Sequence, residues 1–154
     1  MFFPQFRVVK FIPCILHSEN KVLSIIELGN LTRDKFDFIN LQYGDIEEDL
    51  NKLDKHNIKL NTLKIDLFND FEKIAALLKN IDLFITVSNS TAHLAGALNV
   101  PTWLIKPRTF ALFHYWNQPS SCCPWYPSIR LIEQDVNNRD LFEKLKEEVI
   151  KFLN

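Results

Sequence analysis

The chain has 154 residues, of which 47% are hydrophobic and 24% are charged, and its formal net charge is −1 at pH 7. A chain of this length can bury the core of one globular domain and is too short for two full ones. A net charge this close to zero, in a sequence without a basic stripe, disfavours a nucleic-acid-binding surface. We therefore expect no nucleic-acid partner.

Neither a membrane span nor a signal peptide is predicted. The longest apolar candidate, residues 8–16, is interrupted by Lys10 and Pro13 and is far shorter than the roughly 20 apolar residues that a spanning helix needs. No small-residue cleavage site follows this segment.

The cysteines indicate a reducing compartment, and we therefore expect a cytoplasmic protein. Their number, three, is odd, and the adjacent Cys122 and Cys123 lack the two-residue spacing of a redox or zinc motif. We expect unpaired thiols and no metal site. Only three glycines occur, so the glycine-rich fingerprints of dinucleotide binding and of P-loops are absent, and no bound cofactor is expected.

In chain order, residues 1–22 are the least regular part. Residues 6–12 form a candidate strand, but Pro13 interrupts the pattern and no helical period follows. We therefore expect a poorly defined segment over residues 1–22 and one ordered domain over residues 23–154.

From residue 23 onward, apolar runs and amphipathic stretches alternate at short intervals. This alternation is typical of an α/β fold, a Rossmann-like parallel sheet with helices on both faces, in which ligands bind beyond the carboxyl ends of the strands. Residues 108–128, rich in aromatic side chains, are expected to form a long ordered loop. A short turn or helix is expected over residues 32–36, strands over 36–41, 63–65, 83–87 and 102–105, and helices over 46–56, 70–78, 92–98 and 138–153.

The most informative stretch joins the strand at residues 83–87 to the helix that follows it. The strand runs directly into polar residues from Ser88 to Thr91. The first backbone N–H groups of a helix have no internal partner and carry the positive end of the helix dipole, so this start can bind a phosphate. Capping of the helix by these side chains is the alternative. His93, in the first turn, is similarly either a ligand-binding residue or a packed one.

Two groups of candidate site residues follow from the strand ends and the aromatic loop. The expected donor- or phosphate-binding residues are Ser88, Asn89, Ser90, Thr91, His93, Lys106 and Arg108. The expected cleft-lining residues come from a strand-end loop and from rings that can stack on a ligand, and they are Gln42, Tyr43, Gly44, Trp116, Trp125 and Tyr126. The aromatic residues are equally consistent with plugging the sheet, and no catalytic residue is assigned.

Three motifs occur in a defined order along the chain. Residues 38–45 read Phe-Ile-Asn-Leu-Gln-Tyr-Gly-Asp, residues 88–101 read Ser-Asn-Ser-Thr-Ala-His-Leu-Ala-Gly-Ala-Leu-Asn-Val-Pro, and residues 125–130 read Trp-Tyr-Pro-Ser-Ile-Arg after the aromatic run 113–116. The motifs resemble a strand-end loop, the phosphate loop and the aromatic signature of the C-terminal, donor-binding domain of GT-B glycosyltransferases. The resemblance, over about residues 23–153, is to family 9 heptosyltransferase-like proteins and to the related domain found behind tetratricopeptide repeats.

The resemblance implies that residues 23–154 are a nucleotide-sugar-binding domain. The implied reaction transfers a sugar from a nucleotide diphosphate sugar to an acceptor without an obligatory metal. The start of the helix would stabilise the departing diphosphate, with His93 and Lys106 or Arg108 as supporting donors. A Rossmann-like N-terminal half, or a repeat domain, is an expected partner, because the acceptor and the base come from the other half of such enzymes.

One departure from the family pattern concerns Ser88, which stands where the resemblance places an Asp that contacts the donor sugar. A neutral hydroxyl cannot act as a carboxylate acid or base. Two alternatives therefore stay open: a truncated or diverged non-catalytic binding module, and a nucleotide-sugar epimerase-like enzyme. Binding without turnover favours the first, and conversion of a nucleotide sugar without an acceptor favours the second.

Overall fold

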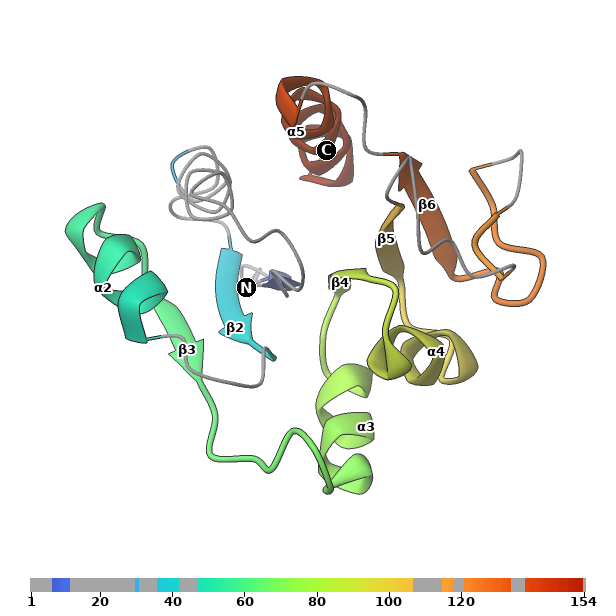
Figure 1. Cartoon of the computed structure of the whole chain (residues 1–154), viewed down its shortest axis with the longest axis horizontal. Coiled ribbons are helices and arrows are strands. Elements are labelled where there is room, and N and C mark those ends of the chain that lie inside the picture. The colour runs from blue at the N-terminus through green and yellow to red at the C-terminus, as the bar shows by residue number, and fades with distance from the viewer. Residues whose placement is uncertain are drawn as a thin grey trace, which may run out of the picture.

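The computed structural model describes residues 7–11, 30, 36–41, 47–106, 115–117, 121–133 and 138–153. Within them, one sheet of six parallel strands runs in the order β3-β2-β1-β4-β5-β6 (Figure 1). The predicted α/β, Rossmann-like fold is confirmed. The strands are β1 (Arg7–Phe11), β2 (Phe36–Asn40), β3 (Leu60–Thr62), β4 (Leu83–Val87), β5 (Thr102–Lys106) and β6 (Ile129–Glu133). The helices are α2 (Glu47–Lys55), α3 (Phe71–Lys79), α4 (Ser90–Ala97) and α5 (Asn138–Leu153).

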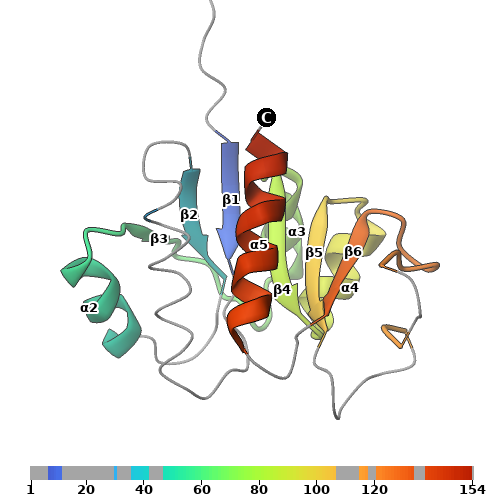
Figure 2. The ribbon, with the colours of Figure 1, turned by 90° about the horizontal axis from the view of Figure 1, so that it is seen from above.

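Helices cover both faces of the sheet. In Figure 2, α5 crosses in front of the strands, and α3 and α4 lie behind them. On the α5 face, Ile85 of β4 belongs to the same core cluster as Leu145 of α5. On the other face, Phe84 of β4 clusters with Ile74 of α3 and Ala95 of α4. Because both faces of β4 are covered, its sequence is a continuous apolar run instead of an alternating one.

β1 lies in the middle of the sheet, between β2 and β4. Val9 is paired with Phe38 of β2 on one side and with Leu83 of β4 on the other. The candidate strand over residues 6–12 is therefore confirmed, and the sheet begins ahead of residue 23, where the sequence pattern starts the ordered domain. A strand of five residues that contains Lys10 and is followed closely by Pro13 offers too few positions for a clear period.

Most predicted elements agree with the observed ones to within two residues; one predicted strand is displaced, and one observed strand was not predicted. β3 occupies Leu60–Thr62 and not the expected 63–65, because the strand is placed by its pairing with β2, where Leu60 lies opposite Phe38. β6 was not expected, since the sequence pattern indicates no strand after residue 128. The turn expected over 32–36 lies outside the described residues, apart from Phe36 in β2.

β4 and α4 together form the edge on which the predicted phosphate site lies. α4 ends in a Schellman motif, in which the N–H of Val100 donates to the carbonyl of Ala95 and Asn99 adopts a left-handed conformation with φ 55°. Pro101 follows and cannot continue the helix. This ending limits α4 to eight residues and returns the chain to β5.

Candidate functional site

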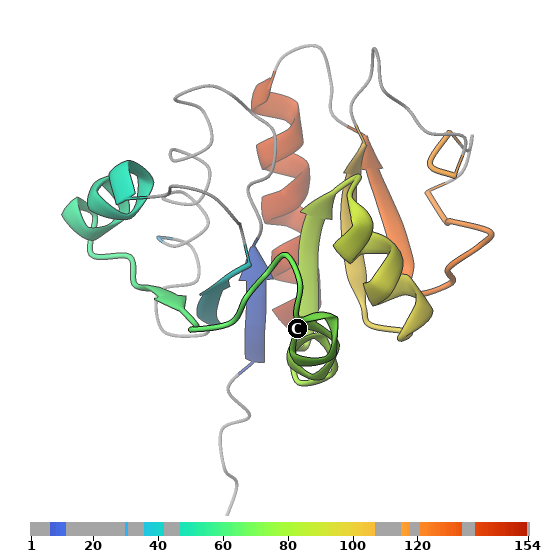
Figure 3. The ribbon, with the colours of Figure 1, turned by 60° about the horizontal axis from the view of Figure 1, so that its bottom comes forward.

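Asn89 is the N-cap of α4. Its Oδ1 accepts the N–H of Ala92 at 2.8 Å, and its Nδ2 donates to Oγ1 of Thr86 at 3.1 Å. These bonds fix the start of the helix against the end of β4. Figure 3 shows how the chain passes from β4 into α4. Ser90 is exposed and Thr91 is half-buried. Their backbone N–H groups precede the first complete turn, so they have no acceptor within the helix and are the donors that remain for a ligand.

Ser88, the residue before the cap, is hydrogen-bonded to Trp116, which lies between β5 and β6 in the chain. The indole Nε1–H of Trp116 donates to the hydroxyl oxygen of Ser88 at 2.9 Å. Trp116 is only 1% exposed, so this hydrogen bond is shielded from water. An indole has no acceptor, and the hydroxyl hydrogen of Ser88 must therefore point to a different group.

His93 lies in the first turn of α4 and is surrounded by aromatic rings. Its ring centroid is 4.8 Å from that of Trp116, 5.2 Å from that of Tyr115 and 5.6 Å from that of Tyr126. Its Nδ1 lies 3.1 Å from the hydroxyl oxygen of Tyr126. Burial lowers the pKa of His93 below its ordinary value, so the neutral imidazole is the main form at pH 7.

Tyr126 reaches His93 by lying directly against Gly96. A Cβ atom at position 96 would lie 2.5 Å from Cγ of Tyr126 and 2.9 Å from Cδ1 of Ile129. Any residue larger than glycine would therefore push the tyrosine ring away from the helix. Gly96 allows the close contact between α4 and the segment before β6.

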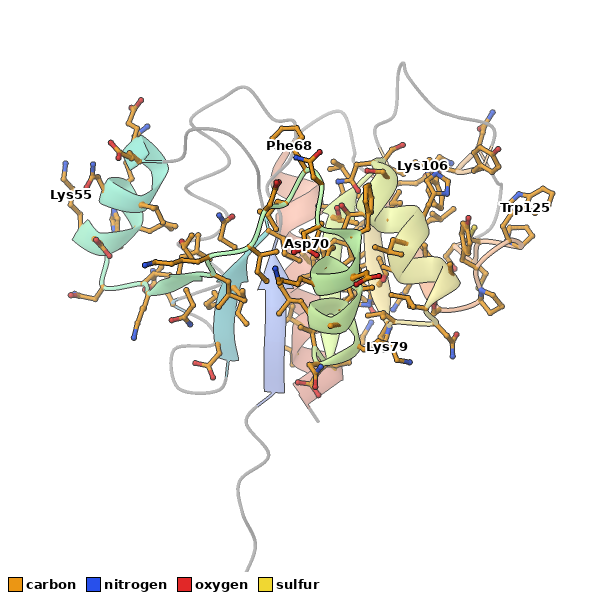
Figure 4. All side chains as sticks on the ribbon, turned by 90° about the horizontal axis from the view of Figure 1, so that it is seen from below. Lys55, Phe68, Asp70, Lys79, Lys106 and Trp125 are labelled. Carbon is orange, nitrogen blue, oxygen red and sulfur yellow. The ribbon has the colours of Figure 1, made fainter. Side chains whose placement is uncertain are left out.

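Lys106, at the end of β5, is a buried cation with a carboxylate partner. Its Nζ lies 3.0 Å from Oε1 of Glu133, the residue opposite it at the end of β6, and the two side chains are 8% and 66% exposed. Figure 4 shows Lys106 toward the edge to which the strand arrowheads point. A phosphate at this edge would compete with the more exposed Glu133 for the ammonium group. Sequence reasoning missed Glu133 because β6 was not predicted, and Arg108 lies outside the described residues.

The residues expected to line a cleft have different environments. Trp116 is buried in a core cluster with Ala92 of α4 and Leu104 of β5, so it is part of the core and does not line a cleft. Trp125 is 61% exposed (Figure 4), and its ring is T-shaped to that of Tyr115 at a centroid distance of 6.2 Å. The remaining ones are Tyr126, which is half-buried, and Gln42, Tyr43 and Gly44, which lie outside the described residues.

Neither of the two described cysteines forms a disulfide; Cys122 is exposed and Cys123 is buried. Among the residues that the structure describes, no group of three or more His, Cys, Asp and Glu side chains lies together as a metal site would require. In that same part of the chain, no helix combines the length and the apolar character needed to cross a membrane.

The fold and these contacts define a Rossmann-like α/β domain with a polar helix start at the carboxyl edge of its sheet. Four of the predicted donors, Ser88, Ser90, Thr91 and His93, gather at that start. Asn89 is also there, but its side chain caps the helix by accepting the N–H of Ala92. Lys106 lies at the end of the neighbouring strand β5.

Comparison with known proteins identifies the fold as that found in half of a family 9 glycosyltransferase. The structure matches ADP-heptose LPS heptosyltransferase II from E. coli with a TM-score of 0.64 and 16% identity, over 97% of this chain and 47% of that chain. It matches the glycosyl transferase family 9 protein from Veillonella parvula DSM 2008 with a TM-score of 0.63 and 13% identity, over 97% of this chain and 46% of that chain. The fold is therefore heptosyltransferase-like, and the chain spans less than half of either structure.

Sequence comparison adds one curated relative. The chain is 36% identical to Protein FlbA from Caulobacter vibrioides over 97 residues, which make up 60% of this chain and 15% of that protein. No family model matches the sequence.

Proposed function

We propose that this domain binds a nucleotide diphosphate sugar and is the donor half of a sugar-transfer enzyme of the GT-B type. The observation that carries the proposal is the start of α4. Asn89 caps this helix from within the chain and leaves the backbone N–H groups of Ser90 and Thr91 at the carboxyl edge of the sheet. Ligands of open α/β sheets bind at that edge, and a helix N-terminus favours negative charge. The likeness in fold to an ADP-heptose heptosyltransferase supports a diphosphate sugar as the ligand.

In the proposed reaction, the bond between the anomeric carbon of the sugar and the diphosphate oxygen breaks. An acceptor oxygen, which gives up its proton to a base, forms the new bond. Negative charge then grows on the departing diphosphate. Donors that are fixed before the reaction stabilise this growing charge without reorganisation, and Ser90 and Thr91 on the capped helix meet that requirement.

We assign supporting roles to three side chains around this helix start. Ser88 and His93 would donate hydrogen bonds. Lys106 would supply positive charge once the diphosphate replaces Glu133 as the partner of its ammonium group. The acceptor site and the base would come from a second Rossmann-like half or from a repeat domain in the cytoplasm, with no metal or bound cofactor in this half. That arrangement is part of the proposal, since the chain spans 47% of the heptosyltransferase that it matches.

A second candidate function, a non-catalytic binding module, is favoured by one observation. Ser88 stands where the resemblance places a sugar-binding Asp, and its oxygen accepts the indole N–H of Trp116. A neutral, already bonded hydroxyl would hold a donor sugar less strongly than a carboxylate. A diphosphate would still bind, because its recognition rests on backbone amides.

A thermal-shift panel of nucleosides, nucleoside diphosphates and nucleotide sugars tests the proposal. A ligand at about 100 times its Kd stabilises a fold by roughly 2.7 kcal/mol. We expect stabilisation by nucleoside diphosphates and nucleotide sugars that the matching nucleosides do not give. Equal effects of all three classes, or none, would contradict the proposal. If a nucleotide sugar binds, assaying its turnover with and without an acceptor separates transferase, epimerase and binding module.

A further inference from the structure

Two polar side chains near the cap of α4, those of Ser88 and His93, are each held by an aromatic residue from outside the helix. Trp116 contacts Ser88, and Tyr126 contacts His93. Both aromatic residues belong to the stretch before β6, and Trp116 is too deeply buried to meet a ligand itself. Their contacts determine which atoms of Ser88 and His93 remain for other partners.

For Ser88 the direction of the hydrogen bond follows from the chemistry of indole. The Nε1–H of Trp116 can only donate, so the oxygen of Ser88 is the acceptor in this 2.9 Å bond. The hydroxyl hydrogen is left for another acceptor, and the second lone pair of the oxygen is left for another donor. Because Trp116 is buried, solvent does not compete for its N–H, and the orientation of Ser88 is stable.

For His93 the hydrogen-bond direction depends on the tautomer. A neutral imidazole has one nitrogen that donates and one that accepts. The phenolic O–H of Tyr126 is a good donor and lies 3.1 Å from Nδ1 of His93. When Nδ1 accepts this hydrogen, the ring proton resides on Nε2. Among the described residues, Nε2 has no hydrogen-bond partner, so its N–H is available to a ligand.

We propose that Tyr126 is a positioning residue that makes Nε2 of His93 a hydrogen-bond donor, and that Trp116 orients the hydroxyl of Ser88, so that this end of α4 presents N–H and O–H groups to an acceptor-rich group such as a phosphate. The location of the ligand rests on the proposed function, whereas the tautomer of His93 does not. A diphosphate presents several acceptors and no donor, so it can accept the N–H of His93 and the O–H of Ser88 together. We therefore assign the diphosphate of a nucleotide sugar to these two groups.

The tautomer is tested in the ligand-free full chain by long-range ¹H–¹⁵N NMR of histidine-labelled protein. The resonances of His93 are assigned by their loss in His93→Gln. We expect the proton on Nε2 in the wild type and a mixture of tautomers in Tyr126→Phe, which keeps the ring against Gly96. Tyr115→Phe is the matched control, because Tyr115 also packs on His93 at 5.2 Å and should leave the tautomer unchanged. A wild-type proton on Nδ1, or no change in Tyr126→Phe, would overturn the proposal.

The ligand class is tested by titrating the same proteins with inorganic pyrophosphate and ADP. Tyr126→Phe should weaken both about fivefold, which corresponds to about 1 kcal/mol for one hydrogen bond, and Tyr115→Phe should not. An unchanged affinity in Tyr126→Phe would overturn the positioning role while the proposed function stands. If the wild type binds neither probe and no nucleotide sugar, the proposed function fails, whatever the tautomer of His93.

Discussion

Trp116 and Ser88 lie 28 positions apart in the chain and are joined by a hydrogen bond of 2.9 Å from the indole N–H to the serine oxygen. The bond connects the end of β4 with the aromatic stretch that precedes β6. Because Ser88 adjoins the cap of α4, the aromatic stretch contributes to the geometry of the candidate site as well as to the core.

A double-mutant cycle on this pair should show coupling. Ser88→Ala leaves the buried N–H of Trp116 without an acceptor, and we expect a loss of about 1–3 kcal/mol in the free energy of unfolding. Trp116→Phe removes the same bond and leaves a cavity, at a cost of about 2 kcal/mol. The double variant should be less destabilised than the sum by about 1 kcal/mol in urea denaturation. Strict additivity would show that the bond contributes nothing.

The assignment of Asn89 as the cap predicts an order of stabilities. Asn89→Ala should lower the free energy of unfolding by about 1 kcal/mol, because the N–H of Ala92 loses its acceptor. Asp70→Ala, which removes the cap of α3, is a control of the same kind away from the site. Ser90→Ala should stay within about 0.5 kcal/mol of the wild type. A Ser90→Ala loss equal to that of Asn89→Ala would contradict this assignment.

Gly96→Ala should destabilise the protein, although alanine is the better helix former. The new Cβ would overlap the ring of Tyr126, whose Cγ would lie 2.5 Å away. Overpacking of this kind costs about 1–3 kcal/mol, against a gain in helix propensity of about 1 kcal/mol. Thermal unfolding measures the net loss. Tyr126→Ala provides space for the Cβ, so adding Gly96→Ala to that variant should cause little further loss of stability. A further loss as large as in the wild-type background would mean that the new Cβ clashes with a residue other than Tyr126.

The half-buried His93 should make stability depend on pH below about 6.5, the ordinary pKa of histidine. Burial lowers the pKa of His93 in the folded state, so the unfolded chain binds the proton more readily. Stability is therefore full above the unfolded pKa and falls as the pH drops from there toward the folded pKa. Urea denaturation of wild type and His93→Gln at several pH values should show a shallower decline in the variant. Parallel curves would mean that His93 does not contribute.

Local patterns predicted the elements on which the site lies. The apolar run of β4 and the polar residues after it defined the end of a buried strand and the start of α4, and the ending at Asn99 and Pro101 was equally clear. The candidate strand over residues 6–12 is confirmed as β1, although its central place in the sheet depends on pairing with strands distant in sequence. β6 was not predicted, because it is short and is placed by its pairing with β5.

The contacts within the site could not be predicted from the sequence, because they too join residues that are distant along the chain. Sequence reasoning grouped Ser88 to Thr91 as equivalent donors, whereas three-dimensional contacts separate Asn89 as the cap and Ser88 as the acceptor for Trp116. The approach of Tyr126 to His93 depends on the absence of a side chain at Gly96, and no spacing in the sequence reveals such a contact.

The central claim, that a diphosphate binds at the start of α4, is tested most directly by amide chemical shifts in ¹⁵N-labelled full-length protein during titration with ADP. The account predicts that the amides of Ser90 and Thr91 shift most. The start of α3 is an internal control, because the carboxylate of Asp70 already caps it and repels an anion. Saturation by ADP or a nucleotide sugar that leaves the amides of Ser90 and Thr91 unmoved would contradict the claim.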